Sequence, residues 1–289
     1  MTEKTVLLIV AHPDDEVIWA LGWVSCFQDM GYTVCCLCLS GQDSLSPREQ
    51  EFARASESMG IRGLVLGTPL LHAETLHTDL VKKTEEGIRR LAIKKESLRM
   101  VVTHSPYGDE HLHPHHMQIF REVRKFTRKA AIPFAFVSQI LPPVYKFVPR
   151  SSPFLIRFQR TSIIGVLNCS FRYMYYAYYY SRKTRHFPFF SKYVAMLSYS
   201  SEEKRKTLRD CYPSIDPDMH IDGYHSLSSN LEYLFFDDDH FRRELERSDR
   251  QGIDGHSLFE EMTIFSRAVR KLIQRMGGLH ALHAQKEKP

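Results

Sequence analysis

The first 140 residues alternate between short apolar runs and longer segments with helical spacing, and few folds accommodate this alternation. The apolar runs are rich in Val, Leu, Ile and Cys, which is typical of strands buried on both faces. The predicted strands are residues 6–10, 33–39, 64–66, 99–103 and 134–137. The predicted helices are residues 17–30, 78–95 and 115–129, and a fourth from a cap at Ser44 or Ser46, through Pro47, to Met59. Repeated strand–helix–strand units predict a Rossmann-like α/β fold, with a mostly parallel sheet flanked by helices.

The composition excludes several classes of protein. With 43% hydrophobic and 25% charged residues, the chain is typical of a globular protein and not of a disordered one. The net charge of +5 mildly favours anionic partners, but no nucleic-acid-binding module is recognisable, and we expect no nucleic-acid partner. No stretch approaches the ~18 apolar residues of a transmembrane helix, although peripheral membrane contact stays open. The six cysteines form no disulfide-like ladder, so we expect buried, reduced thiols in a cytoplasmic protein.

Residues that can bind a metal follow two of the predicted strands. Ala11-His-Pro-Asp-Asp-Glu16 comes directly after the first strand, and five histidines lie at positions 104, 111, 113, 115 and 116, after the fourth. Ligands bind beyond the carboxyl ends of parallel strands, so we expect both segments to meet in one cleft. Two histidines and one carboxylate, with water at an open position, are the typical ligand set of a hydrolytic metal site.

Three motifs resemble those of the LmbE-like (PIG-L) metal-dependent N-deacetylases. Residues 11–16 match that family's A-H-P-D-D-E motif, and residues 113–116 fit its H-x-x-H motif, which is often H-P-D-H. Between them, residues 48–60 are similar to the family's R-x-x-E…A…L-G helix. The resemblance extends over residues 5–140, about half of the chain.

The resemblance implies a role for each matching residue. His12, Asp15 and His116 would be the metal ligands, with Zn²⁺ as the usual ion and Fe²⁺ as an alternative. Asp14 would be the general base, and His113 would stabilise the oxyanion, as an imidazolium. The chemistry agrees, because a bound divalent ion lowers the pKa of water from ~15.7 to about 7 and a carboxylate can take the proton during attack.

The remaining expectations concern the substrate contacts and the positions where the second motif departs from the family's pattern. We expect Arg48, His72 and Tyr107 to contact the substrate. His115 occupies the position of the acidic residue in H-P-D-H, which puts the hydrogen bonds that orient the ligands in doubt. His104, Asp109 and His111 are either spare ligands or groups that support the ligands.

The sequence changes character after Ile140. A Pro-rich stretch at 141–149 is followed by residues 151–188, which are dense in Arg, Phe and Tyr. We expect one strand at 194–199 and helices at 202–211, 227–246 and 258–276, an α-rich C-terminal extension. We treat residues 1–289 as one domain, in which 1–140 form the metal-binding core and 141–289 shape the substrate site. The Tyr-rich run at 173–180 is either a binding platform or a packed element with solvated charges, and we favour the second.

The site residues and the resemblance together imply a zinc-dependent hydrolase that removes the N-acetyl group from an N-acetylglucosamine-type conjugate. The substrate would be free, nucleotide-linked or lipid-linked, in glycan, glycolipid or secondary-metabolite biosynthesis. One alternative is an amidase that acts on a non-acetyl or non-sugar acyl amide. Another is a catalytically silent glycan-binding protein. The sequence does not determine the oligomeric state.

Overall fold

The computed structural model describes residues 3–40, 47–68, 80–106, 113–138, 193–215, 231–249 and 257–260. The chain divides into two compact units, one formed by Met1–Ile140 and Tyr193–Leu258 and the other by Leu141–Lys192 and Phe259–Pro289. The elements that carry the candidate site belong to the first unit. The expected single domain of residues 1–289, with a metal-binding core at 1–140 and a substrate-shaping part at 141–289, stays a prediction.

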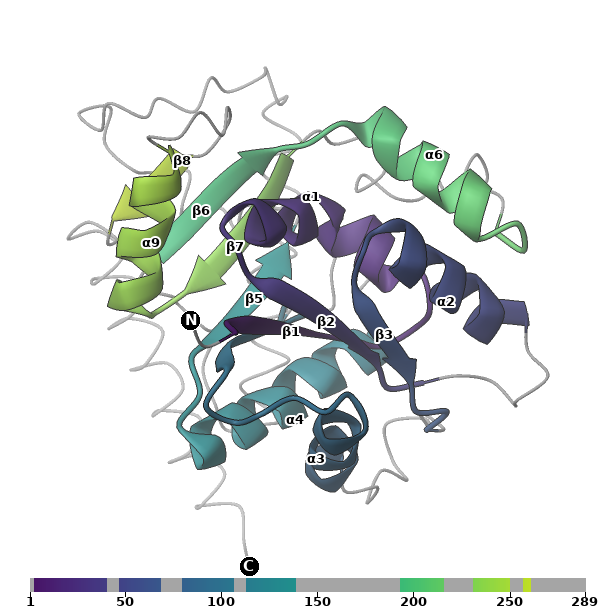
Figure 1. Ribbon diagram of the computed structural model, residues 1–289, viewed down its shortest axis with the longest axis horizontal. Helices are drawn as coiled ribbons and strands as arrows, with labels where there is room; N and C mark the ends of the chain where they lie inside the picture. The colour runs from purple at the N-terminus through teal and green to yellow at the C-terminus, as the bar shows by residue number, and fades with distance from the viewer. Residues whose placement is uncertain are drawn as a thin grey trace, which may run out of the picture. The chain divides into compact units, whose positions relative to one another are not determined.

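A parallel sheet lies at the centre of the first unit (Figure 1). Its parallel strands are β1 (Thr5–Val10), β2 (Thr33–Cys38), β3 (Arg62–Val65), β4 (Leu98–Thr103) and β5 (Phe134–Ser138), in the spatial order β3-β2-β1-β4-β5. Strand β1 is buried along its whole length and pairs with β2 on one side and β4 on the other. The strand order reverses between β1 and β4, which is where ligands bind in folds of this kind. The predicted Rossmann-like sheet is therefore confirmed.

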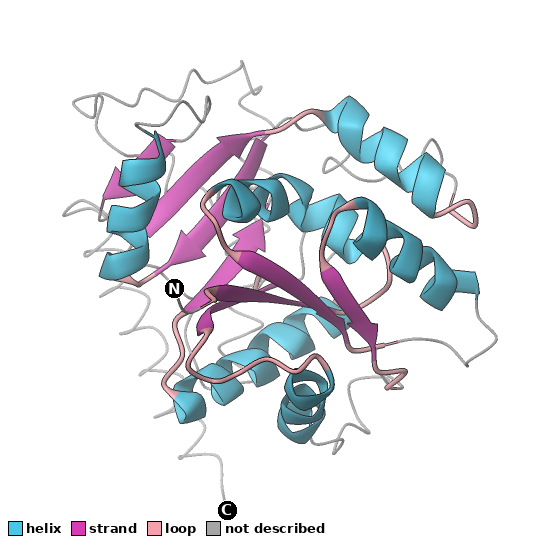
Figure 2. Cartoon of the chain, viewed as in Figure 1, coloured by secondary structure: helices cyan, strands magenta, loops and turns pink. Residues whose placement is uncertain are grey.

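Helices cover both faces of this sheet (Figures 1 and 2). Side chains alternate along β1: Val6, Leu8 and Val10 belong to one apolar core, while Leu7 and Ile9 belong to the other. The first core is completed by α1 (Asp15–Asp29) and α2 (Pro47–Ser58), and the second by α3 (Leu80–Arg90) and α4 (Pro114–Ala130). All nine strands and helices predicted within residues 1–140 are present, with ends that differ by a few residues.

The C-terminal half of the chain adds further strands to the same sheet. Strand β7 (Leu231–Phe236) pairs antiparallel with β5, and β6 (Tyr193–Ser198) pairs antiparallel with β7, followed at the edge by β8 (Ser257–Glu260). Helices α6 (Ser201–Cys211) and α9 (Asp239–Asp249) pack on the face that α1 covers. The strand expected at 194–199 and the helix expected at 202–211 are confirmed.

The helix expected at 227–246 is wrong over its first half. Residues 231–236 form strand β7 instead, and the helix begins only at Asp239. The run Tyr233-Leu-Phe-Phe236 is buried and inserted between β5 and β6, where it pairs on both sides. Of the helix expected at 258–276, residues 258–260 belong to strand β8, and the remainder lies outside the described residues.

Two further expectations concern cysteines and membranes. Cys26, Cys35, Cys36, Cys38 and Cys211 are all buried free thiols, as predicted. The sixth cysteine lies outside the described residues. Among the helices of the described segments, none is long and apolar enough to cross a membrane.

A buried ion pair fixes helix α1, which leads from the candidate site into the core. Lys204 Nζ lies 2.5 Å from Glu232 Oε1, and neither side chain is exposed to solvent. Lys204 also donates to the carbonyl of Ile18, and Glu232 accepts from the backbone N–H groups of Gly22 and Trp23. The pair therefore bonds to backbone groups in the middle of α1 from two other elements, α6 and β7.

Candidate metal centre

The turn between β1 and α1 presents two neighbouring aspartates to different partners. Asp14 has a left-handed backbone, with φ of 113°, which is unfavourable for a side chain larger than that of glycine. Its N–H donates to Glu16 Oε2 over 3.1 Å, and the hydroxyl of Tyr212 donates to the other oxygen of Glu16. Glu16 and Tyr212 are both fully buried. These bonds hold the backbone of Asp14 in this strained conformation.

Three side chains, from the turn after β1, the start of α1 and the first turn of α4, lie close together. His116 Nε2 lies 3.3 Å from His12 Nδ1. Asp15 Oδ2 lies 3.4 Å from the same nitrogen of His12, and Asp15 Oδ1 lies 3.4 Å from the same nitrogen of His116. Ligands at about 2.0–2.1 Å from a tetrahedral zinc ion lie about 3.3–3.4 Å from one another. Both the donor types and their spacing therefore fit a divalent metal. We refer to His12, Asp15 and His116 as the inner set.

The carboxylate of Asp15 is held by several donors. The backbone N–H of His12 donates to it over 2.7 Å, and the indole N–H of Trp19 donates over 3.2 Å. Burial alone would raise the pKa of Asp15, but His116 and His104 hold that pKa well below its ordinary value. Asp15 is therefore ionised, as a metal ligand must be.

His104 lies behind the inner set. Its Nε2 accepts from the N–H of Ala11 over 2.9 Å and lies 3.3 Å from Asp15. Its ring stacks on that of His116, with centroids 3.9 Å apart. Of the two roles left open by the sequence, this geometry favours support of the ligands.

Asp14 faces Arg48 across the turn. Arg48 Nη1 lies 3.0 Å from Asp14 Oδ2, and it also donates to the carbonyl of Pro13. Burial and the neighbouring Asp15 raise the pKa of Asp14 to about 7, although Arg48 opposes this shift. Two adjacent carboxyl groups with opposite pKa shifts suit one ligand and one proton acceptor. The same α2 helix is anchored by Glu51, which accepts from the backbone N–H and the hydroxyl of Ser214.

His113 and His115 lie at the start of α4, next to His12. Burial, and the neighbouring His116, His12 and His115, lower the pKa of His113 to about 3. His113 is therefore a neutral imidazole at neutral pH, which differs from the imidazolium that the sequence analysis expects. His115 Nδ1 lies 2.9 Å from His12 Nε2 and can accept its hydrogen bond, as the acidic residue of H-P-D-H would.

Sequence reasoning missed several supporting residues and placed others where the structure gives no description. Trp19 follows Asp15 by one helical turn, which is a spacing that could have indicated the contact. No local signal points to Tyr212, because it lies 196 positions from Glu16. Of the predicted substrate contacts, His72 and Tyr107 lie outside the described residues.

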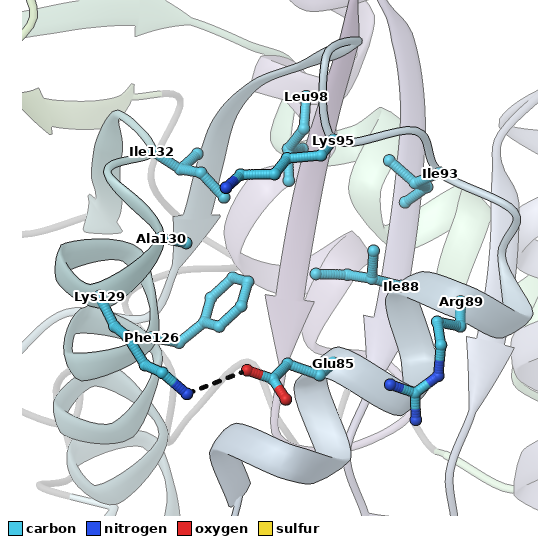
Figure 3. A pocket seen from close by; sticks show the side chains of 10 residues that line it. All are labelled: Glu85, Ile88, Arg89, Ile93, Lys95, Leu98, Phe126, Lys129, Ala130 and Ile132. Atoms are coloured by element: carbon cyan, nitrogen blue, oxygen red, sulfur yellow. Dashed lines mark hydrogen bonds and ion pairs between the residues drawn. The ribbon is translucent and has the colours of Figure 1, made fainter.

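A separate pocket of about 360 Å³ opens elsewhere, between the C-terminal ends of α3 and α4 (Figure 3). Leu98, which begins β4, lines it, so it lies at the amino end of that strand and not at the carboxyl end, where His104 follows. An ion pair joins two of its lining residues, Lys129 and Glu85. This pocket therefore does not belong to the metal centre.

A His/Asp/His cluster that could bind a metal lies at the switch point of the sheet, beside a second carboxyl group. Residues 7–127 match the family model described as GlcNAc-PI de-N-acetylase (PIG-L). This part of the chain is a PIG-L (LmbE-like) domain, and the match supports a hydrolytic deacetylase.

Comparison with curated proteins gives no significant match. Among solved structures, a deacetylase–teicoplanin complex from the teicoplanin biosynthesis pathway is 13% identical, with a TM-score of 0.45, over 82% of this chain and 100% of that one. The N,N'-diacetylchitobiose deacetylase of Pyrococcus horikoshii is 15% identical, with a TM-score of 0.39, over 89% and 84% of the two chains. A conserved protein of Thermus thermophilus is 25% identical, with a TM-score of 0.36, over 47% and 69%.

Proposed function

We propose that this protein is a zinc-dependent deacetylase that hydrolyses the acetamide of an N-acetylated amino sugar. The observation that carries the proposal is the inner set, whose three ligand atoms lie within 4.8 Å of one another. The carboxyl group of Asp14, which is buried, belongs to the neighbouring residue. The PIG-L match over residues 7–127 supports amide hydrolysis as the reaction. A cytoplasmic location, where the buried thiols stay reduced, is part of the same proposal.

The bound ion would supply a water of lowered pKa and positive charge for the substrate carbonyl. Asp14 takes the proton of the attacking water and later returns it to the departing amine. Arg48 holds the Asp14 carboxylate in place through its 3.0 Å contact. The neutral His113 donates an N–H to the oxygen that becomes negative as the water attacks. In this scheme His12, Asp15 and His116 hold the ion and take no part in proton transfer.

The test is acetate release from N-acetylglucosamine in free, nucleotide-linked and lipid-linked form, with metal content measured on the same protein. We expect acetate from one substrate class, loss of activity with a chelator, and recovery with Zn²⁺. A matched control is His240→Gln, because this exposed histidine on α9 lies outside the site.

Other outcomes have distinct meanings. A protein that carries one metal ion but releases no acetate would contradict the sugar substrate and favour another acyl amide. A folded protein without metal or acetate release would contradict the whole proposal and favour a silent glycan-binding protein.

A further inference from the structure

The pocket between α3 and α4 has an apolar interior. Its volume of about 360 Å³ lies within the range of small-molecule sites. Phe126 and Leu98 are buried, and Figure 3 shows that Phe126 and Ile88 point toward the middle of the pocket. The apolar lining residues are Ile88, Ile93, Leu98, Phe126, Ala130 and Ile132. The interior can therefore hold the apolar body of a ligand.

The charged residues of the lining are mostly basic. Arg89, Lys95 and Lys129 line the pocket, together with one acidic residue, Glu85. Lys129 Nζ lies 3.5 Å from Glu85 Oε1, and because these side chains are 73% and 38% exposed, their ion pair is weak and the lysine can exchange partners. The ammonium group of Lys95 forms no ion pair with any residue of the described segments. The lining therefore carries an excess of positive charge, which suits an anionic group.

The surface around the pocket is strongly basic as well. Residues 80–99 and 114–134, which include α3 and α4, contain twelve Lys or Arg residues and four Glu residues, so their net charge is +8. The whole chain has a net charge of +5, so the remainder is negative on balance. The two helices pack on the same apolar core and are joined by the Lys129–Glu85 pair. The positive charge of the protein is therefore concentrated around this pocket, where it attracts anions.

We propose that this pocket binds a small amphipathic anion, which has an apolar body and one carboxylate or phosphate group. The apolar body packs against Phe126 and Ile88, and the anionic group contacts the exposed ammonium groups of Lys95 and Lys129. Glu85 competes with the ligand for Lys129. A free amphiphile and an anionic lipid both offer this chemistry.

The site does not depend on the proposed deacetylase function. Leu98, which lines the pocket, begins β4, whereas His104 and the histidines of the metal centre follow the other end of this strand. Binding can also be measured without any amide substrate, so a failure of one proposal leaves the other standing.

The test is isothermal titration calorimetry of the full chain with octanoate, and with 1-octanol as a neutral analogue of the same length. We expect octanoate to bind and 1-octanol to bind much more weakly. Lys95→Gln/Lys129→Gln should lower the affinity for octanoate roughly tenfold, because two charged contacts are lost. The matched control is Lys125→Gln/Arg128→Gln, which removes the same charge from α4 outside the pocket and should change the affinity little.

Two further variants distinguish binding in the pocket from a loss of folding. Glu85→Gln removes the competing carboxylate, so its affinity for octanoate should rise, which a misfolded protein cannot produce. Ala130→Phe places a ring in the pocket and should abolish binding. Vesicles of phosphatidylcholine, with and without phosphatidylglycerol, separate the two sources of ligand. Sedimentation with phosphatidylglycerol vesicles that octanoate prevents would identify a lipid, whereas octanoate binding without sedimentation would identify a free amphiphile.

Three results would overturn the proposal. The first is no binding of octanoate to the unchanged protein. The second is equal binding by the unchanged protein, Lys95→Gln/Lys129→Gln and Ala130→Phe, which would place octanoate elsewhere, for example at the metal centre. The third is a loss of affinity in Lys125→Gln/Arg128→Gln as large as that in the pocket variant, because the charge of the whole face would then explain the binding.

Discussion

Replacing Lys204 by Met tests how strongly the buried ion pair holds helix α1. Methionine keeps most of the apolar stem but removes the charge that lies 2.5 Å from Glu232. Glu232 would then be a buried carboxylate whose remaining donors are the N–H groups of Gly22 and Trp23. Breaking one partner of such a pair costs about 3–5 kcal/mol. Because whole domains are stable by about 5–15 kcal/mol, Lys204→Met should remove a large fraction of the free energy of unfolding.

A double-mutant cycle separates the ion pair from the packing around it. Glu232→Gln keeps an acceptor for the backbone but leaves Lys204 without a counter-charge, so it should cost a similar amount. The double variant Lys204→Met/Glu232→Gln contains no buried charge at this position. Its loss of stability should therefore be clearly smaller than the sum of the two single losses.

Urea unfolding followed by tryptophan fluorescence is the assay. The chain has two tryptophans, Trp19 and Trp23, and both are buried on α1. The control is Lys206→Met on the same helix, because Lys206 pairs with Asp210 at the surface and should change stability little. Stabilisation of α1 by the ion pair would be refuted if Lys204→Met lowered the free energy of unfolding no more than this control does. It would also be refuted if the losses of the two single variants added up to that of the double variant.

Three further changes test the site and its support. Asp14→Asn should lower acetate release by about 10²–10⁴-fold while bound zinc is retained, because only the proton acceptor is lost; unchanged turnover would exclude Asp14 as the base. Tyr212→Phe removes the hydroxyl bonded to Glu16, so urea titration should show a loss of about 1–3 kcal/mol in the free energy of unfolding, and kcat should fall. A stability and a kcat equal to those of the unchanged protein would show that this hydroxyl does not support the site. Gly22→Ala places a Cβ 2.8 Å from that of Tyr199 and should cost about 1–3 kcal/mol in thermal denaturation, whereas an unchanged Tm would refute the close packing.

The parallel core could be predicted from the sequence because its signals are local. Strands buried on both faces, such as β1 and β2, are largely apolar, and this makes them visible as short runs. His12 and Asp15 lie within one turn, and His116 follows the fourth strand, so the topology alone brings them to one edge of the sheet. The metal-ligand hypothesis therefore needed no knowledge of distant contacts.

Strand β7, the support of Asp14 and the protonation of His113 were decided by contacts between residues far apart in the chain. The run Tyr233-Leu-Phe-Phe236 fits either a buried helix or a buried strand, and pairing with β5 and β6 selects the strand. The support of Asp14 by Glu16 depends on Tyr212, which only folding brings near. The neutral state of His113 depends on burial and on three neighbouring imidazoles. Local sequence patterns determine the elements of the parallel core. Burial and long-range pairing determine strand β7, the partners of each element and the protonation of the groups between them.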